Sequence, residues 1–278
     1  MKKIAITGST GLIGSRIIGL LKNEFRFIEI LQTDTDITNR KQTAAFIKKI
    51  EFDLLLHLAG FTDVDGAENN REITQKINVD GTKNVFDAVL EKHKQFIYIS
   101  TDFVFDGQKP PYFEDSPPHP LSFYAQTKYE GEKIVNPLSN GKAMIVRLSY
   151  PYRKDFAPKR DFVRNIKTAL EQKKPLQMVT DSLITPTFID DIAHGLAHLM
   201  NNFSPEIFHL VGGDSMSPFE AGRLVAKIFN LDDSLIRPVT YRQYYENKAP
   251  RPQFSDIRSK KNHFQPMNGF QEGLKKML

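Results

Sequence analysis

Short apolar runs alternate with stretches of helical spacing through the first half of the chain. The apolar runs read as strands over residues 3–7, 27–31, 53–59, 95–100 and 143–149. The stretches between them repeat apolar positions with the period of an α-helix, over 12–22, 40–50, 71–92 and 121–136. Strands that alternate with helices are typical of a parallel sheet covered on both faces. The pattern therefore predicts an α/β fold with a doubly wound parallel sheet.

Composition narrows the class of protein without naming a function. The 278 residues are 40% hydrophobic and 26% charged, which is ordinary for a soluble globular protein. The chain has no cysteine, so disulfides and thiolate metal sites are excluded, and the first apolar run breaks at Thr7 and Gly8, too early for a secretory signal. We expect a cytoplasmic protein that does not bind membranes or nucleic acid, since no apolar run is long enough to span a bilayer and the net charge of +5 is spread out.

A glycine-rich turn follows the first strand in the stretch TGSTGLIGS. Gly8, Gly11 and Gly14 are three residues apart, at the point where the strand gives way to a helix. Such glycines allow a tight turn, a close approach of the backbone to a pyrophosphate, and close packing of the helix on the sheet. The helix N-terminus adds free N–H groups and the positive end of its dipole. The turn predicts a Rossmann-like domain that binds a dinucleotide.

After residue 150 the alternation becomes less regular. Further helices are expected at 159–172, 188–202 and 217–230, with short strands at 176–179 and 206–211. We interpret residues 1–150 as the dinucleotide-binding domain, to which a segment near 186–211 returns. Residues 151–278 would then form mainly a substrate-binding lobe. The proline-rich segment 107–122 is expected to be irregular, and to serve either as a substrate lid or as a plain connector.

The choice between NAD and NADP stays open. An acidic residue about 20 positions after the glycine turn binds the adenosine ribose in dinucleotide-binding domains, which favours NAD. Asp34 stands at that distance, with Asp36 as an alternative. Arg40 and Lys41 are close enough in sequence to contact the 2′-phosphate of NADP.

The candidate reaction chemistry lies at the end of the fourth strand and in the helix after the proline-rich segment. Tyr124 and Lys128 are one helical turn apart, so both side chains project from one face. A nearby ammonium group lowers the pKa of a phenol, which prepares the tyrosine to protonate a substrate oxygen. Thr101 follows the strand, where ligands collect in doubly wound sheets, and its hydroxyl would orient a carbonyl.

These elements, in this order, resemble the extended short-chain dehydrogenase/reductase family, and in particular its RmlD-like branch of dTDP-4-dehydrorhamnose reductases. The matching stretches are 57–68, 77–85, 99–107, 124–133 and 251–257. The resemblance implies a catalytic trio of Thr101, Tyr124 and Lys128. It implies cofactor contacts from the glycine turn and nearby positions, namely Gly8, Thr10, Gly11, Leu12, Ile13, Gly14, Ala59, Gly60, Asn78, Lys128 and Ser149. It implies substrate contacts from Thr62, Asp102, Phe103, Tyr150 and Arg251.

The chain departs from the family pattern on the substrate side. RLSY at 147–150 replaces an Arg-Thr-Ser-Trp stretch, DSLITPT at 181–187 lacks the usual glutamine and glycine, and Phe254 replaces an asparagine. The function implied by the resemblance is an NAD(P)H-dependent reductase of a 4-keto sugar nucleotide, and a homodimer is possible. A related epimerase and a non-catalytic NADP-binding regulatory protein are the alternatives. No metal site is predicted, because His194 and His198 read as exposed residues of an amphipathic helix.

Overall fold

The protein is built around one parallel sheet. The structure, a computed structural model, describes the backbone of all 278 residues and every side chain except those of 139 and 140. The six strands run in the order β2-β1-β3-β4-β5-β9, and every neighbouring pair is parallel. Their bounds are β1 Lys2–Thr7, β2 Phe25–Ile30, β3 Leu54–His57, β4 Gln95–Thr101, β5 Ala143–Leu148 and β9 Ile207–His209. The predicted doubly wound, Rossmann-like fold is confirmed.

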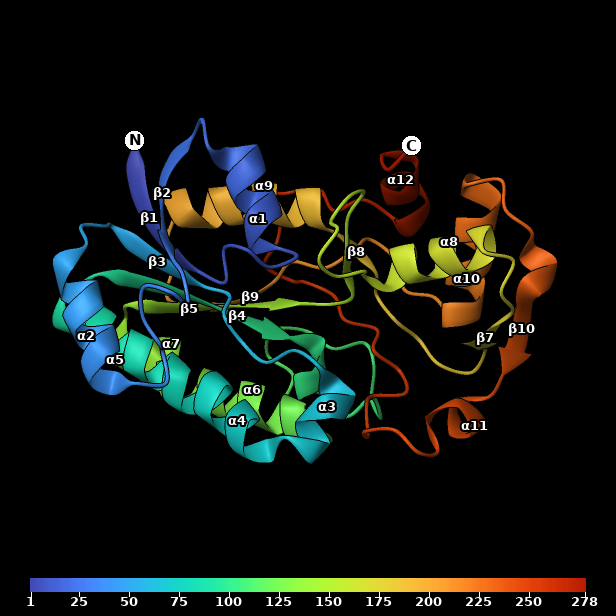
Figure 1. The fold of residues 1–278 in the computed structure, drawn as a ribbon, viewed down its shortest axis with the longest axis horizontal. Coiled ribbons are helices and arrows are strands. Elements are labelled where there is room, and N and C mark those ends of the chain that lie inside the picture. Colours follow the sequence, from blue (N-terminus) through green and yellow to red (C-terminus); the bar gives the residue numbers. More distant parts are fainter.

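Helices cover both faces of this sheet (Figure 1). One face carries α1 and α9, which pack on each other, and the other carries a layer formed by α2, α5 and α6. The bounds are α1 Gly14–Leu21, α9 Ile189–Asn201, α2 Arg40–Lys49, α5 Thr82–Glu91 and α6 Phe123–Val135. Fully buried aliphatic and aromatic side chains of the strands form a separate apolar core with each helical layer. Removing this apolar surface from water is the main force that holds the layers together.

The predicted helix over 71–92 is present, and it contains a π-helical turn. It consists of α4 (Arg71–Gln75), a π-helical turn over Lys76–Gly81, and then α5. Two short helices that the pattern did not predict, α3 and α7, span Val64–Asn69 and Pro137–Asn140. The π-helical turn brings the side chain of Asn78 into the interior, where it is 1% exposed.

The remaining elements lie beside the sheet and surround their own apolar core (Figure 1). Two pairs of short parallel strands occur here, β6 with β8 and β7 with β10. The bounds are β6 Pro151–Tyr152, β7 Leu176–Val179, β8 Thr187–Phe188, β10 Ile236–Val239, α8 Phe162–Glu171, α10 Pro218–Ile228, α11 Tyr241–Tyr245 and α12 Phe270–Lys275. We call this part the small lobe. The division of the chain at residue 150 stays a prediction, while β9 pairs with β5 at the edge of the main sheet.

The proline-rich segment 107–122 is irregular, as expected, and is tied to the C-terminal part of the chain. The backbone carbonyl of Tyr112 accepts a hydrogen bond from the Arg258 N–H at 2.8 Å, and the backbone N–H of Tyr112 donates one to the Asp256 carbonyl at 2.9 Å. The buried Glu114 carboxylate accepts a hydrogen bond from the Lys260 N–H at 3.0 Å. Within the described side chains, none from this segment lines the cleft described below, which favours the connector over the lid.

Candidate active site

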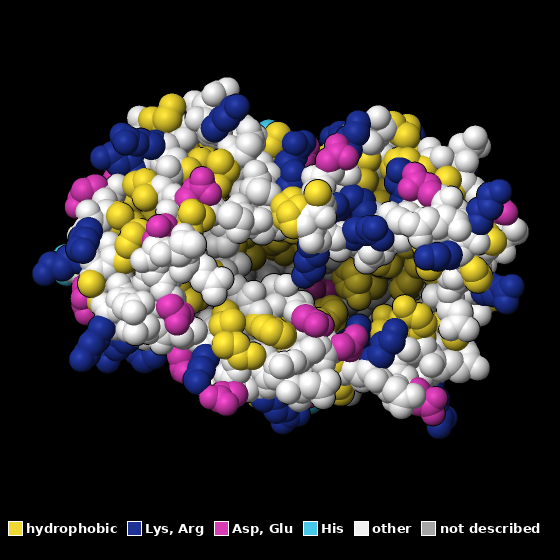
Figure 2. All heavy atoms as spheres, viewed as in Figure 1, with side chains coloured by type: hydrophobic (Ala, Val, Ile, Leu, Met, Phe, Trp, Pro, Cys, Tyr) yellow, Lys and Arg dark blue, Asp and Glu magenta, His cyan; other side chains and the backbone are white. Residues whose placement is uncertain are grey.

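A cleft of about 550 Å³ opens at the carboxyl ends of the parallel strands, between the sheet and the small lobe. Its lining comes from the turn after β1, the segment after β3, the end of β4, α6, and the segment that leads into α8. Figure 2 shows the hollow between the two halves of the molecule, with hydrophobic side chains inside it and basic side chains near its rim. Doubly wound sheets bind ligands at this edge, so the cleft is the expected position of a site.

The glycine turn forms one end of the cleft, and its geometry requires glycine. Gly8 has a φ of +68°, and a Cβ added to it would lie 2.8 Å from the Ala59 nitrogen. A Cβ on Gly14 would lie 2.4 Å from the Gly8 carbonyl oxygen. At Gly11, which lines the cleft, a Cβ would meet only that same oxygen, at 3.1 Å. The bare backbone beside the start of α1 therefore fits a pyrophosphate group.

The three predicted catalytic residues lie together in the cleft. Thr101 ends β4, while Tyr124 and Lys128 lie one turn apart on α6, and all three line the cavity. The helix begins where it does because the Ser122 hydroxyl accepts a hydrogen bond from the Ala125 N–H at 3.3 Å, a typical N-cap. This start places the phenol in the first turn and the ammonium in the next. Tyr124 is 8% exposed and Lys128 is 7% exposed.

Lys128 is held by the end of β4 and not by the phenol. Its Nζ donates a hydrogen bond to the Ile99 carbonyl at 2.8 Å and lies 4.1 Å from the centre of the Tyr98 ring. Burial lowers the pKa of Lys128 to about 7, and the negative charge of Glu132 opposes that shift. The ammonium group is therefore poised to lose or gain its proton near neutral pH.

The expectation that Lys128 lowers the pKa of Tyr124 is wrong for this structure. Burial raises the pKa of the phenol well above its ordinary value of 10, and the charge of Asp102 adds to the rise. Hydrogen bonding with the Thr101 hydroxyl opposes the shift. The phenol is consequently protonated at neutral pH, which is the form that a proton donor requires.

Asp102 is a buried carboxylate that organises the end of β4. It accepts hydrogen bonds from Thr101 Oγ1 at 3.1 Å, from Ser149 Oγ at 2.9 Å, and from Ser255 Oγ. Burial raises its pKa, and these hydrogen bonds oppose that effect. Asp102 therefore ties the reaction site to β5 and to the C-terminal segment. Sequence reasoning missed Ser255, because nothing near position 255 marks a serine as a partner for a residue 153 positions away.

Asn78 does not line the cleft but supports a segment that does. Its side chain accepts a hydrogen bond from the Phe61 N–H at 2.7 Å and donates to the Phe61 carbonyl at 3.1 Å. It also donates to Thr127 Oγ1 at 3.0 Å, and that hydroxyl donates to the Tyr124 carbonyl at 2.8 Å. Asn78 thereby joins α6 to the segment containing Ala59 and Gly60, which line the cleft.

The two candidate ribose ligands are exposed turn residues outside the lining of the cleft. The Asp34 carboxylate accepts a hydrogen bond from the N–H of Leu31, the residue after β2, at 3.0 Å. Asp36 accepts hydrogen bonds from the N–H and the hydroxyl of Thr38. Asp34 is thus folded back to the end of the strand, whereas Asp36 stabilises the turn that follows. Their roles in cofactor binding stay predictions.

The predicted substrate residues divide into two groups. Thr62, Asp102, Phe103 and Tyr150 line the cleft, and Tyr150 has a φ of +38°. The centre of its ring lies 6.1 Å from that of Phe103. Arg251 is not part of the lining, because its guanidinium forms an ion pair with Asp65.

The segment from β6 to α8 contributes further residues to the cleft. Lys159, Arg160, Asp161 and Phe162 line the cavity beside Tyr150, whose ring centre is 5.8 Å from that of Phe162.

The histidines His194 and His198 are exposed on α9 and are not part of the cleft lining. The ring centre of His198 lies 4.2 Å from that of Phe264, on which it stacks. Among the described residues, none of the helices is both long and apolar enough to cross a membrane.

A Rossmann-like sheet, a glycine turn, and a threonine, tyrosine and lysine gathered in one cleft define the class of short-chain dehydrogenases/reductases. Within that class, the chain belongs to the family described as RmlD substrate binding domain, which matches residues 1–278. The match covers the whole chain, the small lobe included.

Three similar proteins illustrate this family. The dTDP-4-dehydrorhamnose reductase of Mycobacterium tuberculosis is 27% identical over 266 residues, which are 93% of this chain and 86% of that protein. The crystal structure of the dTDP-4-dehydrorhamnose reductase of Bacillus anthracis in complex with NADP has a TM-score of 0.91 and 29% identity, covering 99% of this chain and 98% of that one. Methionine adenosyltransferase 2 subunit beta of Bos taurus is 27% identical over 269 residues, which are 90% of this chain and 79% of that protein.

Proposed function

We propose that this chain is an NAD(P)H-dependent reductase of a 4-keto sugar nucleotide, similar to dTDP-4-dehydrorhamnose reductases. The observation that carries the proposal is the gathering of Thr101, Tyr124 and Lys128 beside a glycine turn in one cleft. The names of the relatives support the same activity, as does the NADP bound in the Bacillus anthracis structure. The cofactor is therefore NADP or NAD, held along the glycine turn.

The reaction needs a hydride and a proton, and the side chains of this chain provide for the proton. A bound reduced nicotinamide supplies the hydride to the carbonyl carbon of the substrate. Tyr124 donates its proton to the carbonyl oxygen, which is far more basic once the carbon has been reduced. Thr101 holds that oxygen by a hydrogen bond, and the charge on Lys128 stabilises the phenolate that remains. The products are a sugar alcohol and the oxidised cofactor.

Two alternatives belong to the same fold. Methionine adenosyltransferase 2 subunit beta is named as a subunit of a transferase and not as a reductase, so the likeness to it is the observation that favours the regulatory alternative. The retention of all three candidate catalytic residues in the cleft favours the reductase, and a related epimerase would use the same tyrosine and lysine. A homodimer and a cytoplasmic location stay predictions.

The test combines binding with turnover in the purified protein. NADPH and NADH are titrated by calorimetry, and oxidation of the better ligand is followed with a panel of dTDP-, UDP- and GDP-linked 4-keto sugars. We expect one of these sugars to be reduced at steady state. Tight binding of a dinucleotide without turnover on any member of the panel would favour the regulatory alternative.

A further inference from the structure

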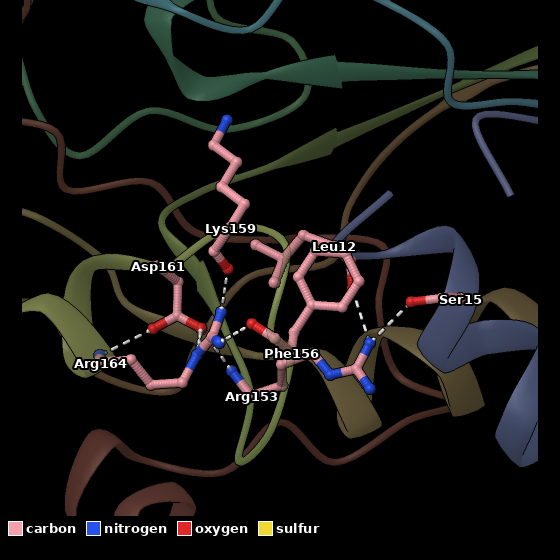
Figure 3. Close-up of polar contacts among 7 residues, drawn as sticks. All are labelled: Leu12, Ser15, Arg153, Phe156, Lys159, Asp161 and Arg164. Carbon is pink, nitrogen blue, oxygen red and sulfur yellow. Dashed lines mark hydrogen bonds and ion pairs between the residues drawn. The ribbon is translucent and has the colours of Figure 1, made fainter. Parts of the chain in front are cut away.

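A loop that we call the strap, residues 153–161, joins β6 to α8 and runs beside the glycine turn (Figure 3). At its start, Arg153 Nη1 donates hydrogen bonds to the Leu12 carbonyl at 3.0 Å and to Ser15 Oγ at 2.9 Å. Towards its end, Lys159 Nζ donates to Thr62 Oγ1 at 3.0 Å, in the segment after β3. The strap therefore connects the small lobe to both segments that would enclose a dinucleotide.

The strap has a defined shape because one arginine of α8 holds it. The Arg164 guanidinium binds the Asp161 carboxylate at 2.7 Å and the Lys159 carbonyl at 2.6 Å, and it also donates to the Phe156 carbonyl (Figure 3). The Arg153 N–H donates to the same Asp161 carboxylate at 3.2 Å. These bonds fix the backbone that carries Arg153, so its reach to the glycine turn is built into the loop.

Three arginines meet here, and two of them have carboxylate partners. Arg16 pairs with Asp190 at 2.6 Å, and Arg164 pairs with Asp161 at 2.7 Å. Among the side chains that the structure describes, no carboxylate lies within 4.0 Å of the Arg153 guanidinium, and its buried Nε has no hydrogen-bond partner. The pKa of Arg153 is lowered by burial and by the charges of the two other arginines, and the charges of Asp190 and Asp155 offset only part of that effect. A partly buried cation without a directly paired carboxylate is unfavourable, and an anionic ligand would relieve that cost.

Arg153 lies beside the glycine turn and is not part of the cleft lining. We propose that it binds a diphosphate group held at that turn, and that this group is the pyrophosphate of the dinucleotide. The inference rests on the proposed function. Guanidinium groups bind phosphate oxygens in pairs through adjacent N–H groups, and Nη1 of Arg153 already contacts the first turn of α1. Arg153 contacts both the glycine turn and the N-terminus of α1, so the backbone N–H groups there and the Arg153 side chain would hold the same anion. Arg153 would then be the contact through which the small lobe helps to hold the bound cofactor.

The other source of the same chemistry is the diphosphate of the sugar nucleotide. The experiment therefore measures two ligands by calorimetry, NADPH and dTDP, with the full chain and its variants. We expect Arg153→Met to raise the Kd of NADPH about 10-fold or more, the loss typical of a charge-assisted hydrogen bond, and to leave the Kd of dTDP unchanged. Arg153→Lys keeps the charge but loses the paired donors, so it should restore only part of the affinity.

Lys154→Met is the matched control, because it removes a neighbouring cation of the strap. Lys154 Nζ donates to the Leu278 carbonyl at 2.8 Å, away from the glycine turn. This variant should bind NADPH with the wild-type Kd. Raised salt should weaken NADPH binding less in Arg153→Met than in the wild type, a change that loss of packing alone would not produce.

The outcomes distinguish a failure of the proposed function from a failure of the role assigned to Arg153. If the wild-type protein binds neither NADPH nor NADH, the proposed function fails. If the wild type binds NADPH and Arg153→Met binds it equally well, this inference alone is overturned. A rise in the Kd of dTDP with an unchanged Kd of NADPH also overturns it and assigns Arg153 to the substrate. If Arg153→Met does not fold, as judged by its melting transition, the same comparison is made with Arg153→Lys, for which a several-fold rise is expected.

Discussion

Two walls of the cleft differ in how they are built. The reaction wall consists of the end of β4 and the first turns of α6, and it carries Thr101, Tyr124 and Lys128. The substrate wall consists of Tyr150 and the residues 159–162 that lead into α8. Regular backbone hydrogen bonds fix the first wall, whereas the second depends on side-chain hydrogen bonds within a loop, such as those from Arg164 of α8 to the strap.

The two walls meet different demands. Residues on a strand end and a capped helix keep one geometry, as proton transfer requires. A wall of loops can change its side chains without disturbing the sheet, so its sequence is free to differ between substrates. Of the positions at which this chain departs from the family pattern, Tyr150 lines the cleft, whereas Phe254 does not.

The largest expected effect comes from the reaction wall. Tyr124→Phe removes the donated proton and keeps the ring, so kcat should fall about 10²–10⁴-fold while the Kd of NADPH stays unchanged. Steady-state kinetics and calorimetry measure the two quantities. Tyr129→Phe, on the same helix, is the control and should retain wild-type kcat. A Tyr124→Phe enzyme with wild-type kcat would remove the proton-donor role.

The next effect is a dependence of stability on pH that belongs to Lys128. Its pKa is lowered from 10.5 to about 7 in the folded protein. Between these values the unfolded chain binds more protons, so the free energy of unfolding rises with pH across this window. Relative to Lys128→Met, the wild type should gain roughly a few kcal/mol between pH 7 and pH 10.

Denaturant unfolding at several pH values checks this prediction, and the difference between the two proteins cancels the other titrating groups. Lys133→Met removes an exposed lysine from the same helix and is the charge-matched control. A constant difference between wild type and Lys128→Met across the window would mean that the buried lysine does not titrate there.

A smaller effect is expected at Arg251, which lies outside the cleft lining. Arg251 forms an ion pair with Asp65, and their side chains are 13% and 51% exposed; a pair that is half open to solvent is weak enough for a phosphate to displace. Arg251→Met should raise the KM of the sugar nucleotide about 10-fold with little change in kcat, because a charge-assisted contact is lost. Asp65→Asn, which frees the same guanidinium, should leave KM near the wild-type value. Equal effects of the two variants would show that the pair only ties the lobes together.

The smallest expected effect comes from removing the N-cap of one helix in each half of the molecule. Ser122 caps α6 on the reaction wall, and Ser217 caps α10 in the small lobe. Replacing either serine by alanine should cost about 1 kcal/mol in the free energy of unfolding. Only Ser122→Ala should also lower kcat, because the first turn of its helix carries Tyr124. Equal losses of kcat in both variants would contradict the distinction between the walls.

The sequence predicted the features that depend on local periodicity. The order of strands and helices, the glycine turn, and the spacing of Tyr124 and Lys128 follow from patterns within one or two turns of chain. The two-residue strands β6 and β8 were not predicted, because a stretch of two residues is too short to show a hydrophobic period. The partnership of Asp102 with Ser255 escaped as well, since it depends on tertiary packing.

Charge interactions were the least predictable part of the site. One turn of helix brings Tyr124 and Lys128 to the same face, which suggested that the ammonium lowers the pKa of the phenol. Burial raises the pKa of the phenol instead, and the lysine binds the Ile99 carbonyl. Likewise, the reach of Arg153 across the glycine turn follows from the shape of the strap, which has no signal in the sequence.

The most direct test of hydride transfer in this cleft follows the transferred atom itself. NADPH that carries deuterium at both hydrogen positions of its reacting carbon is incubated with the protein and the preferred 4-keto sugar nucleotide, and the product is examined by mass spectrometry and NMR. The account predicts one deuterium bound to carbon 4 of the sugar alcohol, with about 100-fold less or lower still when Tyr124→Phe replaces the wild type over the same time. A product without deuterium, or an unreduced sugar with NADPH tightly bound, would contradict it.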